Sequence, residues 1–316
     1  MMRVTNNMMV NDLRRNLNTS MLAMDKWQRQ LSTTRKLNTP SDDPAGLVKS
    51  LRLRTNLVEG EQYLRNIGEA INFMETTDAS LNDINKIIHR IRELTVKVIN
   101  DTNDDSARSA IAKEIGELTE QIKMTANTTY GTKYIFAGTN VTEKPLQEDA
   151  STVPPTLQWK GNDEAFDIEI AVGIKFRMNI TNGGSSGEDL QNFFMGDPPA
   201  ADLKDDTGIF GILTKLKADI ENADVTGMDG ALSKLDEKMN SLLNARATLG
   251  AKVNRLELQQ SRLTGTQISF TGLLSQVEDA DMSEVIMQLK MQENVYRAAL
   301  GAGARIIQPS LIDFLR

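Results

Sequence analysis

The chain has 316 residues, no cysteine, and a net charge of −7 with a pI near 5.0. The lack of cysteine excludes disulfides and thiolate metal sites, and the acidic balance argues against a general nucleic-acid binder. Aromatic residues make up only 5% of the chain, which favours thin helical bundles over one thick core.

The first predicted helix has an apolar stripe but a weak intrinsic tendency to form a helix. Asn7, Asn11, Asn16 and Asn18 are poor helix formers, so the apolar face needs a partner before the helix is stable. The stripe consists of Met9, Leu13, Leu17, Met21, Met24 and Leu31.

Residues 1–60 are basic, with ten Lys or Arg against five Asp or Glu. A basic arm could contact a membrane surface or nucleic acid. We favour the simpler interpretation of a solvated or inter-subunit helix face. Pro40 ends the first helix, and Asp43 is placed as an N-cap with Pro44 at the first position of the next helix. We expect a break in this second helix near Gly60.

Two long heptad seams follow, one in each half of the chain. Their apolar residues alternate in steps of three and four, as in a coiled coil. The later seam, residues 232–277, would be roughly 65–70 Å long at about 1.5 Å per residue, so it needs a partner of similar length. Asp78 interrupts the first seam, and Arg246 fills a gap in the second. The seam positions are Leu64, Ile71, Leu81 and Ile88, then Leu235, Leu242, Leu249, Leu256 and Leu263.

The texture of the sequence changes between the two seams. A shorter apolar stripe over residues 111–122 predicts a third helix, and residues 207–221 predict a return helix. Between them, short runs of alternating apolar and polar residues are separated by Gly, Asn and Asp turns, which is typical of strands. The predicted strands are residues 134–138, 156–159, 166–170 and 174–180.

The last predicted helix follows an acidic interruption at residues 278–284. Asp281 and Glu284 have capping-box spacing, with Asp in place of Ser or Thr. Ala and Gly are frequent between residues 298 and 304, and Pro309 bends or stops the helix. The apolar positions of the helix and of the tail are Val285, Leu289, Tyr296, Leu300, Ile307, Leu311 and Phe314.

Together these patterns predict a mainly α fold. The N- and C-terminal halves are expected to form an elongated antiparallel helical bundle or coiled coil, with a small β-rich inserted domain that leans on the helical tip. We expect three parts. They are a terminal helical assembly domain of residues 1–60 with 277–316, a helical-bundle rod of residues 61–137 with 207–276, and the insert of residues 138–206.

One acidic loop has a spacing that could suggest calcium. Asp101, Asn103 and Asp105 alternate as in a calcium-binding loop. The sixth position is Ser106 rather than Gly, and the twelfth is Ala112 rather than Glu, so the pattern fails at two demanding positions. We favour a plain turn between helices.

The sequence gives no sign of a catalytic centre. Residues 183–187 match G-x-S-x-G, but no amphipathic helix follows them, and the only histidine, His89, lies on the predicted coiled-coil helix. We therefore predict no catalytic residues, no cofactor-binding residues and no metal ligands, and a protein that is not an enzyme. An enzyme housed in the insert is the least favoured alternative.

The sequence also lacks the common signals for membrane insertion or secretion. Residues 1–7 have no apolar run of the Sec type, and no window approaches the eighteen apolar residues of a transmembrane helix. Taken alone this predicts the cytoplasm, an inference that fails for proteins exported by other machinery. A membrane-surface protein that uses the basic N-terminal arm stays open as an alternative.

Several segments at both ends of the chain resemble the flagellin family. Residues 19–32 followed by 40–46 are similar to the N-terminal signature of that family, in which a helix is followed by an Asp-Asp and Ala-Gly motif. The resemblance covers residues 1–138 and 207–316, and the middle is not diagnostic. The other similar segments are residues 90–94, 131–138, 249–257, 278–282 and 311–315.

Three details resemble the members that join hook to filament more than filament-forming flagellins. They are residues 2–6, the Pro-Ser-Asp-Asp-Pro of residues 40–44, and the tail of residues 308–315. The resemblance implies a structural adaptor of the bacterial flagellum that self-assembles through its terminal helices, with a filament subunit as the alternative. Recognition of residues 90–94 by an innate-immune receptor is left open.

The resemblance also implies where the protein acts and which partners it meets. It implies an extracellular location reached through the flagellar secretion system, without a cleaved signal peptide. The implied partners are other copies in a ring, the adjoining hook-side junction protein, flagellin, and a cytoplasmic export chaperone that binds the C-terminal helix. No cofactor, nucleic acid or membrane is implied. The apolar terminal helices would then be the self-assembly surface, and the two seams would hold the rod together.

Overall fold

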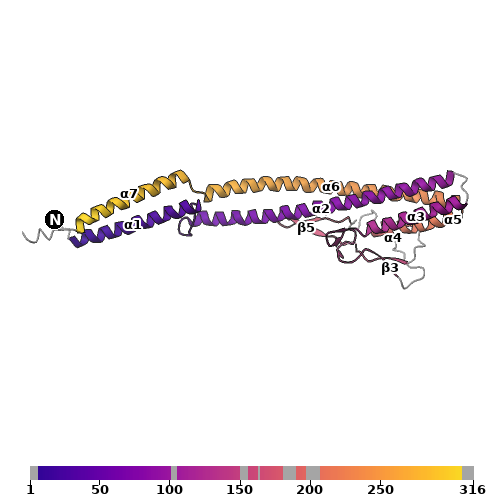
Figure 1. Ribbon diagram of the computed structural model, residues 1–316, viewed down its shortest axis with the longest axis horizontal. Helices are drawn as coiled ribbons and strands as arrows, with labels where there is room; N and C mark the ends of the chain where they lie inside the picture. The colour runs from indigo at the N-terminus through magenta and orange to yellow at the C-terminus, as the bar shows by residue number, and fades with distance from the viewer. Residues whose placement is uncertain are drawn as a thin grey trace, which may run out of the picture. The chain divides into compact units, whose positions relative to one another are not determined.

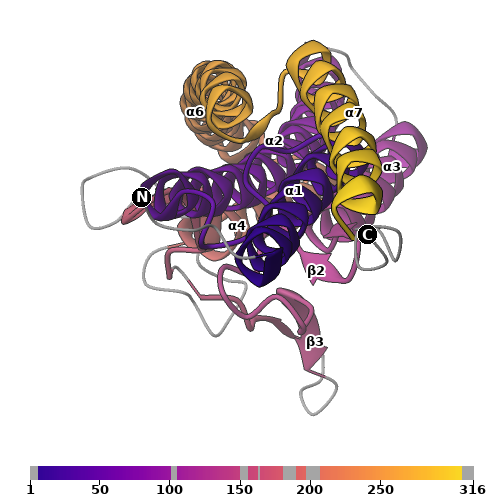
Figure 2. The same ribbon diagram turned by 90° about the vertical axis from the view of Figure 1, so that its left-hand side faces the viewer.

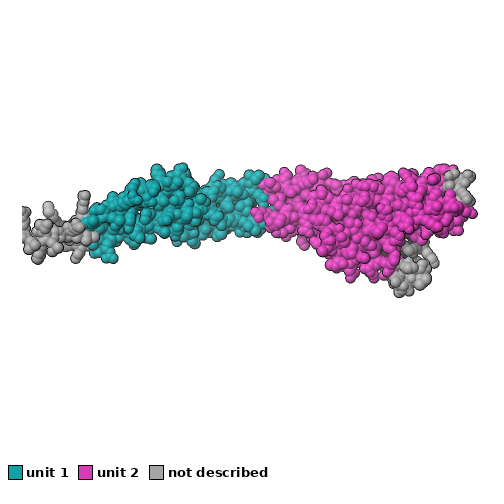
Figure 3. All heavy atoms as spheres, in the orientation of Figure 1, with its two compact units in different colours: residues 1–60, 265–316 teal, residues 61–264 magenta. Residues whose placement is uncertain are grey.

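The computed structural model describes residues 6–100, 105–149, 156–162, 164–180, 190–196 and 207–307. The chain divides into two compact units, coloured differently in Figure 3. Unit 1 contains residues 1–60 and 265–316, and unit 2 contains residues 61–264. Each unit therefore combines segments from both halves of the sequence.

Unit 1 is built from helices of both chain ends. It contains α1 (Asn6–Thr33) and α7 (Met282–Ile307), with the beginning of α2 (Pro44–Asn100) and the end of α6 (Val225–Glu278). α1 and α7 lie side by side in both views (Figures 1 and 2), and contacts from Ser20 to Gln292 and from Leu13 to Gly303 make them antiparallel. The predicted pairing of the two ends is confirmed.

Two helices of unit 1 begin with aspartate caps. The Asp43 carboxylate accepts hydrogen bonds from the amides of Ala45 (3.1 Å) and Gly46 (3.0 Å), and α2 begins at the next residue. The Asp281 carboxylate does the same for the amide of Ser283 at 2.9 Å, directly before α7. Each cap satisfies helix amides that lack an intrahelical partner, so both predicted helix starts are confirmed.

The predicted break near Gly60 is wrong, because α2 runs as one helix through this position. A Cβ on Gly60 would lie 3.5 Å from the Gln267 side chain of α6, an ordinary van der Waals distance, so α6 packs closely beside α2 here. A glycine costs an exposed helix interior only about 1 kcal/mol relative to alanine. Packing against α6 is sufficient to keep the helix continuous.

Unit 2 is a helical bundle with one contiguous apolar core. α2 and α6 lie antiparallel within it, and α3 (Asp105–Ala126) and α5 (Ile209–Glu221) pack beside them. Among the predicted seam positions, the structure buries Leu81, Ile88, Leu235, Leu242, Leu249 and Leu256, and half-buries Leu64, Ile71 and Leu263.

The polar residues that interrupt the seams face each other. Arg246 Nε donates to Asp78 Oδ1 at 2.8 Å, and Arg246 Nη1 donates to Asn82 Oδ1 at 3.0 Å. A second pair joins Arg92 Nε to Asp236 Oδ1 at 2.7 Å. Directional contacts of this kind set the register of two helices, which uniform apolar rows leave less well defined.

The described residues between α3 and α4 (Leu190–Met195) form three short antiparallel pairs of strands, the first of which precedes the predicted insert of residues 138–206. They are β1 (Thr129–Tyr130) with β2 (Lys133–Tyr134), β3 (Leu146–Asp149) with β4 (Thr156–Trp159), and β5 (Asp167–Ala171) with β6 (Ile174–Arg177). The predicted strand over residues 134–138 is wrong beyond Tyr134, where the chain turns. Gly138 has φ of 71°, and a side chain there would collide with the backbone of Asn162.

An aromatic cluster joins the insert to the bundle. Phe194 of α4 (Leu190–Met195) is fully buried, with ring centroids 5.7 Å from Trp159, 6.0 Å from Phe136 and 6.0 Å from Phe210 of α5. Aromatic rings at these separations attract one another beyond simple burial. The described part of the insert thus shares one core with the helices, and the short helix α4 was not predicted.

The structure leaves several of the sequence predictions untested. The three-part domain division stays a prediction, and the compact units place residues 265–276 with the terminal helices. The loop at 101–104, the G-x-S-x-G motif, Leu311 and Phe314 lie outside the described residues. His89 is exposed on α2, as expected of a helix-surface residue.

Candidate assembly surface of the terminal helices

Unit 1 leaves many large apolar side chains exposed. Its buried large apolar side chains are Leu37, Leu53 and Val285 in the described part of the chain, whereas the large core cluster lies wholly in unit 2. Fourteen of the twenty exposed large apolar side chains in that part belong to unit 1, the smaller unit. They are Met8, Met9, Met21, Leu22, Val48, Leu51, Val58, Ile268, Leu273, Ile286, Met287, Met291, Val295 and Leu300.

α7 has two apolar faces, and only one of them is covered. The inner face carries Val285, which is 2% exposed, and Tyr296, which borders a groove against α1. The other face carries residues at intervals of four, four, three and four, a spacing that places them on one side of a helix. These residues are Met287, Met291, Val295, Ala298 and Ala302, called the outer stripe below; all are exposed.

Sequence reasoning missed the outer stripe. Met287 is 62% exposed, Met291 48% and Val295 49%, so a large share of each side chain can still be buried by a partner. The signal was readable as a second periodic row in α7, but the predicted assembly residues do not include Met287, Met291 or Val295.

Some of the predicted self-assembly residues are exposed, and others are buried or half-buried. Their assignment to assembly stays a prediction, because the structure contains one chain. Met9, Met21 and Leu300 are exposed, and Val285 is buried. The side chain of Ile307 lies outside the described set. The half-buried positions are Leu13, Leu17, Met24, Leu31, Leu289 and Tyr296.

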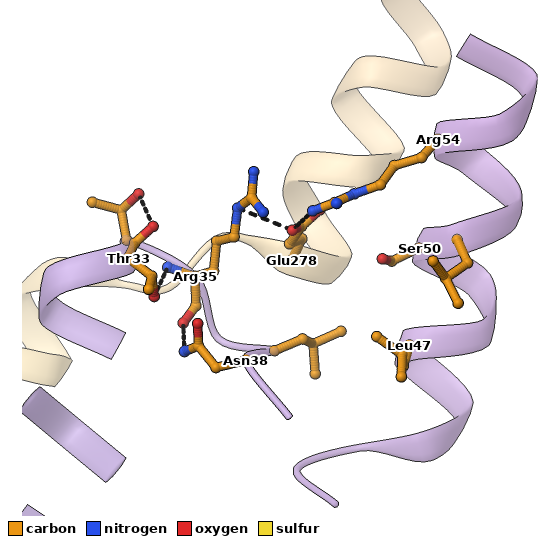
Figure 4. Close-up of a pocket in the computed structure, with 10 residues that line it drawn as sticks. Thr33, Arg35, Asn38, Leu47, Ser50, Arg54 and Glu278 are labelled. Atoms are coloured by element: carbon orange, nitrogen blue, oxygen red, sulfur yellow. Dashed lines mark hydrogen bonds and ion pairs between the residues drawn. The ribbon is translucent and has the colours of Figure 1, made fainter. Parts of the chain in front are cut away.

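A polar cluster organises the chain breaks of unit 1 around Glu278. The Glu278 side chain is only 6% exposed, and it accepts hydrogen bonds from both Nε (3.1 Å) and Nη2 of Arg54. Arg35 Nε lies 3.0 Å from the same carboxylate (Figure 4). A buried carboxylate needs such partners, because losing its hydration without compensation is costly. These residues were not predicted as a group, since they lie far apart in sequence.

Backbone hydrogen bonds reinforce this cluster. The Lys36 amide donates to the Glu278 carbonyl at 2.6 Å, and the Ala280 amide donates to the Thr34 carbonyl at 3.0 Å. Thr34 has φ of 59°, a strained value for a β-branched residue. The linker after α1 and the break before α7 are therefore tied into one unit.

Asp42 holds the linker that joins α1 to α2. Its carboxylate accepts hydrogen bonds from the amides of Asn38 (3.2 Å) and Thr39 (2.9 Å), and Lys26 lies 3.6 Å away. Burial alone would raise the pKa of Asp42, but the hydrogen bonds from Thr39 and Asn38 and the charge of Lys26 outweigh it and lower the pKa. The charged carboxylate thus stabilises the linker.

The described residues contain no cluster of His, Cys, Asp or Glu able to hold a metal ion. None of the helices found there is long and apolar enough to cross a membrane.

The fold and this surface define a class of protein. Terminal helices that pair with each other yet leave apolar faces uncovered are typical of subunits that complete their core in an assembly. The model of the bacterial flagellin N-terminal helical region matches residues 4–141, and that of the C-terminal helical region matches residues 232–315. Together they cover more than half of the chain, which therefore belongs to the flagellin family and is a structural component of the bacterial flagellum. The predicted family and fold class are confirmed.

Curated relatives match most of the chain. A flagellin of Halalkalibacterium halodurans is 27% identical over 273 residues, covering 86% of this chain and 82% of its own length. The flagellar hook-associated protein 3 of Escherichia coli K12 is 25% identical over 312 residues, covering 95% and 96%. Both kinds of flagellar subunit are thus similar to this chain.

Solved structures confirm the fold. A putative flagellar hook-associated protein from Vibrio parahaemolyticus has a TM-score of 0.64 at 18% identity, covering 75% of this chain and all of that one. FlgL of Bacillus cereus has a TM-score of 0.55 at 20% identity, covering 71% and 99%.

Proposed function

We propose that the chain is the adaptor between the hook and the filament, and that it self-assembles through its terminal helices. The observation that carries the proposal is the uncovered apolar surface of unit 1, which contains few buried apolar side chains of its own. Neighbouring subunits that cover this surface would supply the stabilisation that an isolated unit lacks.

One further observation supports the adaptor over a filament subunit. Residues 2–6, 40–44 and 308–315 resemble the junction members of the family. The filament subunit remains the second candidate, because flagellins of similar identity also match most of the chain.

The proposal includes specific partners and a route of export. Copies of the chain form a ring, with the hook-side junction protein on one side and flagellin on the other. The apolar residues of α1 and α7 named above, with Leu311 and Phe314, make the inter-subunit contacts. The protein leaves the cell through the flagellar secretion system without a cleaved signal peptide, and a cytoplasmic chaperone binds its C-terminal helix beforehand.

Deletion of the gene separates the two candidates. For the adaptor, we expect cells that retain hooks, lack filaments and release flagellin into the medium, with filaments restored by the wild-type gene. A filament subunit would give a different result, in which no other flagellin appears in the medium. Normal filaments on the deletion strain would contradict both.

A further inference from the structure

A polar pocket lies beside the buried Glu278 in unit 1. Its walls come from the linker after α1, the first turns of α2 and the end of α6 (Figure 4). Arg35 and Arg54 both approach Glu278 there, so two guanidinium groups share one carboxylate. The pocket therefore carries an excess positive charge, which favours an anionic group.

A free hydroxyl adds to this preference. Ser50 is 3% exposed and points from α2 towards Glu278 (Figure 4). Its hydroxyl has no side-chain hydrogen bond among the described residues, although buried polar groups normally have partners. A carboxylate that enters the pocket would supply the missing acceptor.

Part of the pocket lining is apolar. Leu37, Leu47 and Leu51 contribute to it: Leu37 is buried, Leu47 is half-buried and Leu51 is 54% exposed on the surface. The best ligand therefore combines one carboxylate with large apolar side chains on both sides of it. This combination is more specific than a free inorganic anion, which would leave the leucines uncovered.

One segment outside the described structure has this chemistry. In residues 308–316, Asp313 follows Leu311 and Ile312 and precedes Phe314 and Leu315. The other segments outside the described residues lack an acid with large apolar residues on both sides: they are residues 1–5, 101–104, 150–155, 163, 181–189 and 197–206.

The tail cannot reach the pocket of its own chain. The pocket lies at the beginning of α7, and the 26 residues of that helix extend about 39 Å at 1.5 Å per residue. From the end of α7 at Ile307 to Asp313, six residues extend at most about 20 Å. An occupant with this sequence must come from another copy.

We propose that residues 311–315 of one copy dock into the Glu278 pocket of a neighbouring copy. Asp313 approaches Arg35, Arg54 and the Ser50 hydroxyl, while the flanking apolar side chains cover Leu47 and Leu51. The inference rests on the proposed self-assembly of the chain. It adds a contact that connects the end of one subunit to the chain breaks of the next.

Photo-crosslinking between isotopically distinct copies tests the proposal. Heavy full-length chains carry p-benzoylphenylalanine in place of Phe314 and are assembled with light wild-type chains. We expect heavy–light cross-linked peptides that join position 314 to residues 33–54 or to the region around Glu278. A matched heavy chain carries the probe in place of Met291 of the outer stripe and reports on self-association itself.

The outcomes separate the two levels of inference. If position 291 forms heavy–light links but position 314 links only to regions away from the pocket, the tail contact alone would be overturned. An absence of heavy–light links from both positions would overturn self-assembly as well. Links from position 314 to the pocket of its own chain would contradict the reach argument, and links confined to other parts of its own chain would overturn the tail contact.

A peptide of residues 308–316 gives an independent measure. Fluorescence anisotropy with the full-length chain should show binding that weakens at least about tenfold with Asp313→Asn, because a charge-assisted contact is lost. The variant Leu51→Gln should weaken it too, whereas Met124→Gln, at a more exposed site in unit 2, should not. Equal binding of wild-type and Asp313→Asn peptides would refute the role of the carboxylate, and an inorganic phosphate that competes fully with the peptide would indicate a simple anion site.

Discussion

Polar substitution of the outer stripe should weaken assembly without unfolding the chain. The triple variant Met287→Ser, Met291→Ser and Val295→Ser changes side chains that are 62%, 48% and 49% exposed. Full burial of such a side chain contributes about 1.5–3 kcal/mol, so roughly half of that, about 1 kcal/mol each, is still available to a partner. The loss is about 3 kcal/mol per contact, or roughly a hundredfold in the association constant.

Sedimentation velocity across a concentration series measures this loss, and thermal unfolding of the dilute monomer measures the fold. The melting temperature should change little, because substitutions at exposed positions rarely exceed about 0.5 kcal/mol. The matched control replaces Met124, Val172 and Leu258 of unit 2, which are at least as exposed, with serine. An unchanged association constant in the triple variant, or an equal loss in the control, would refute the reasoning.

Three predictions concern stability. A double-mutant cycle with Arg246→Ala and Asp78→Ala should show coupling of about 1 kcal/mol in urea unfolding, reduced by the partial exposure of both side chains, and no coupling would contradict the seam contact. Asp42 has a pKa below its ordinary 3.8, so its contribution to the free energy of unfolding is complete above pH 3.8 and is lost as the pH falls further. Asp42→Asn should therefore reduce the dependence of the unfolding free energy on pH in the acid range. Gly208→Ala should destabilise the fold by about 2 kcal/mol or more, because a Cβ would collide with the backbone at the end of α4. Gly230→Ala, where a Cβ meets open space, should stabilise it by up to about 1 kcal/mol. Equal effects of the two variants would contradict this packing.

Local signals in the sequence determined the helices and the way they begin. The caps at Asp43 and Asp281 act on amides two or three residues away, so their effect can be read within one turn of chain. The heptad rows likewise depend only on spacing, and they indicated two long helices that need each other. The family resemblance at both ends follows from the same segments and was confirmed by the matched family models.

Features that depend on a distant neighbour were decided by tertiary structure alone. α2 continues through Gly60, where α6 packs close enough for Gln267 to lie 3.5 Å from a Cβ, and Gly138 lies against the backbone of Asn162, where no side chain fits. The cluster around Glu278 gathers side chains more than two hundred residues apart, so no local pattern announces it.

The exposure of the apolar residues of α7 was also decided by the tertiary structure. Periodicity showed which residues of α7 are apolar, but it could not show which of its faces α1 covers. Only the packed helices separate Val285, which is buried, from Met287 and Met291, which are exposed. Spacing along the chain fixes which side chains share a face, whereas burial depends on what the rest of the fold places against that face.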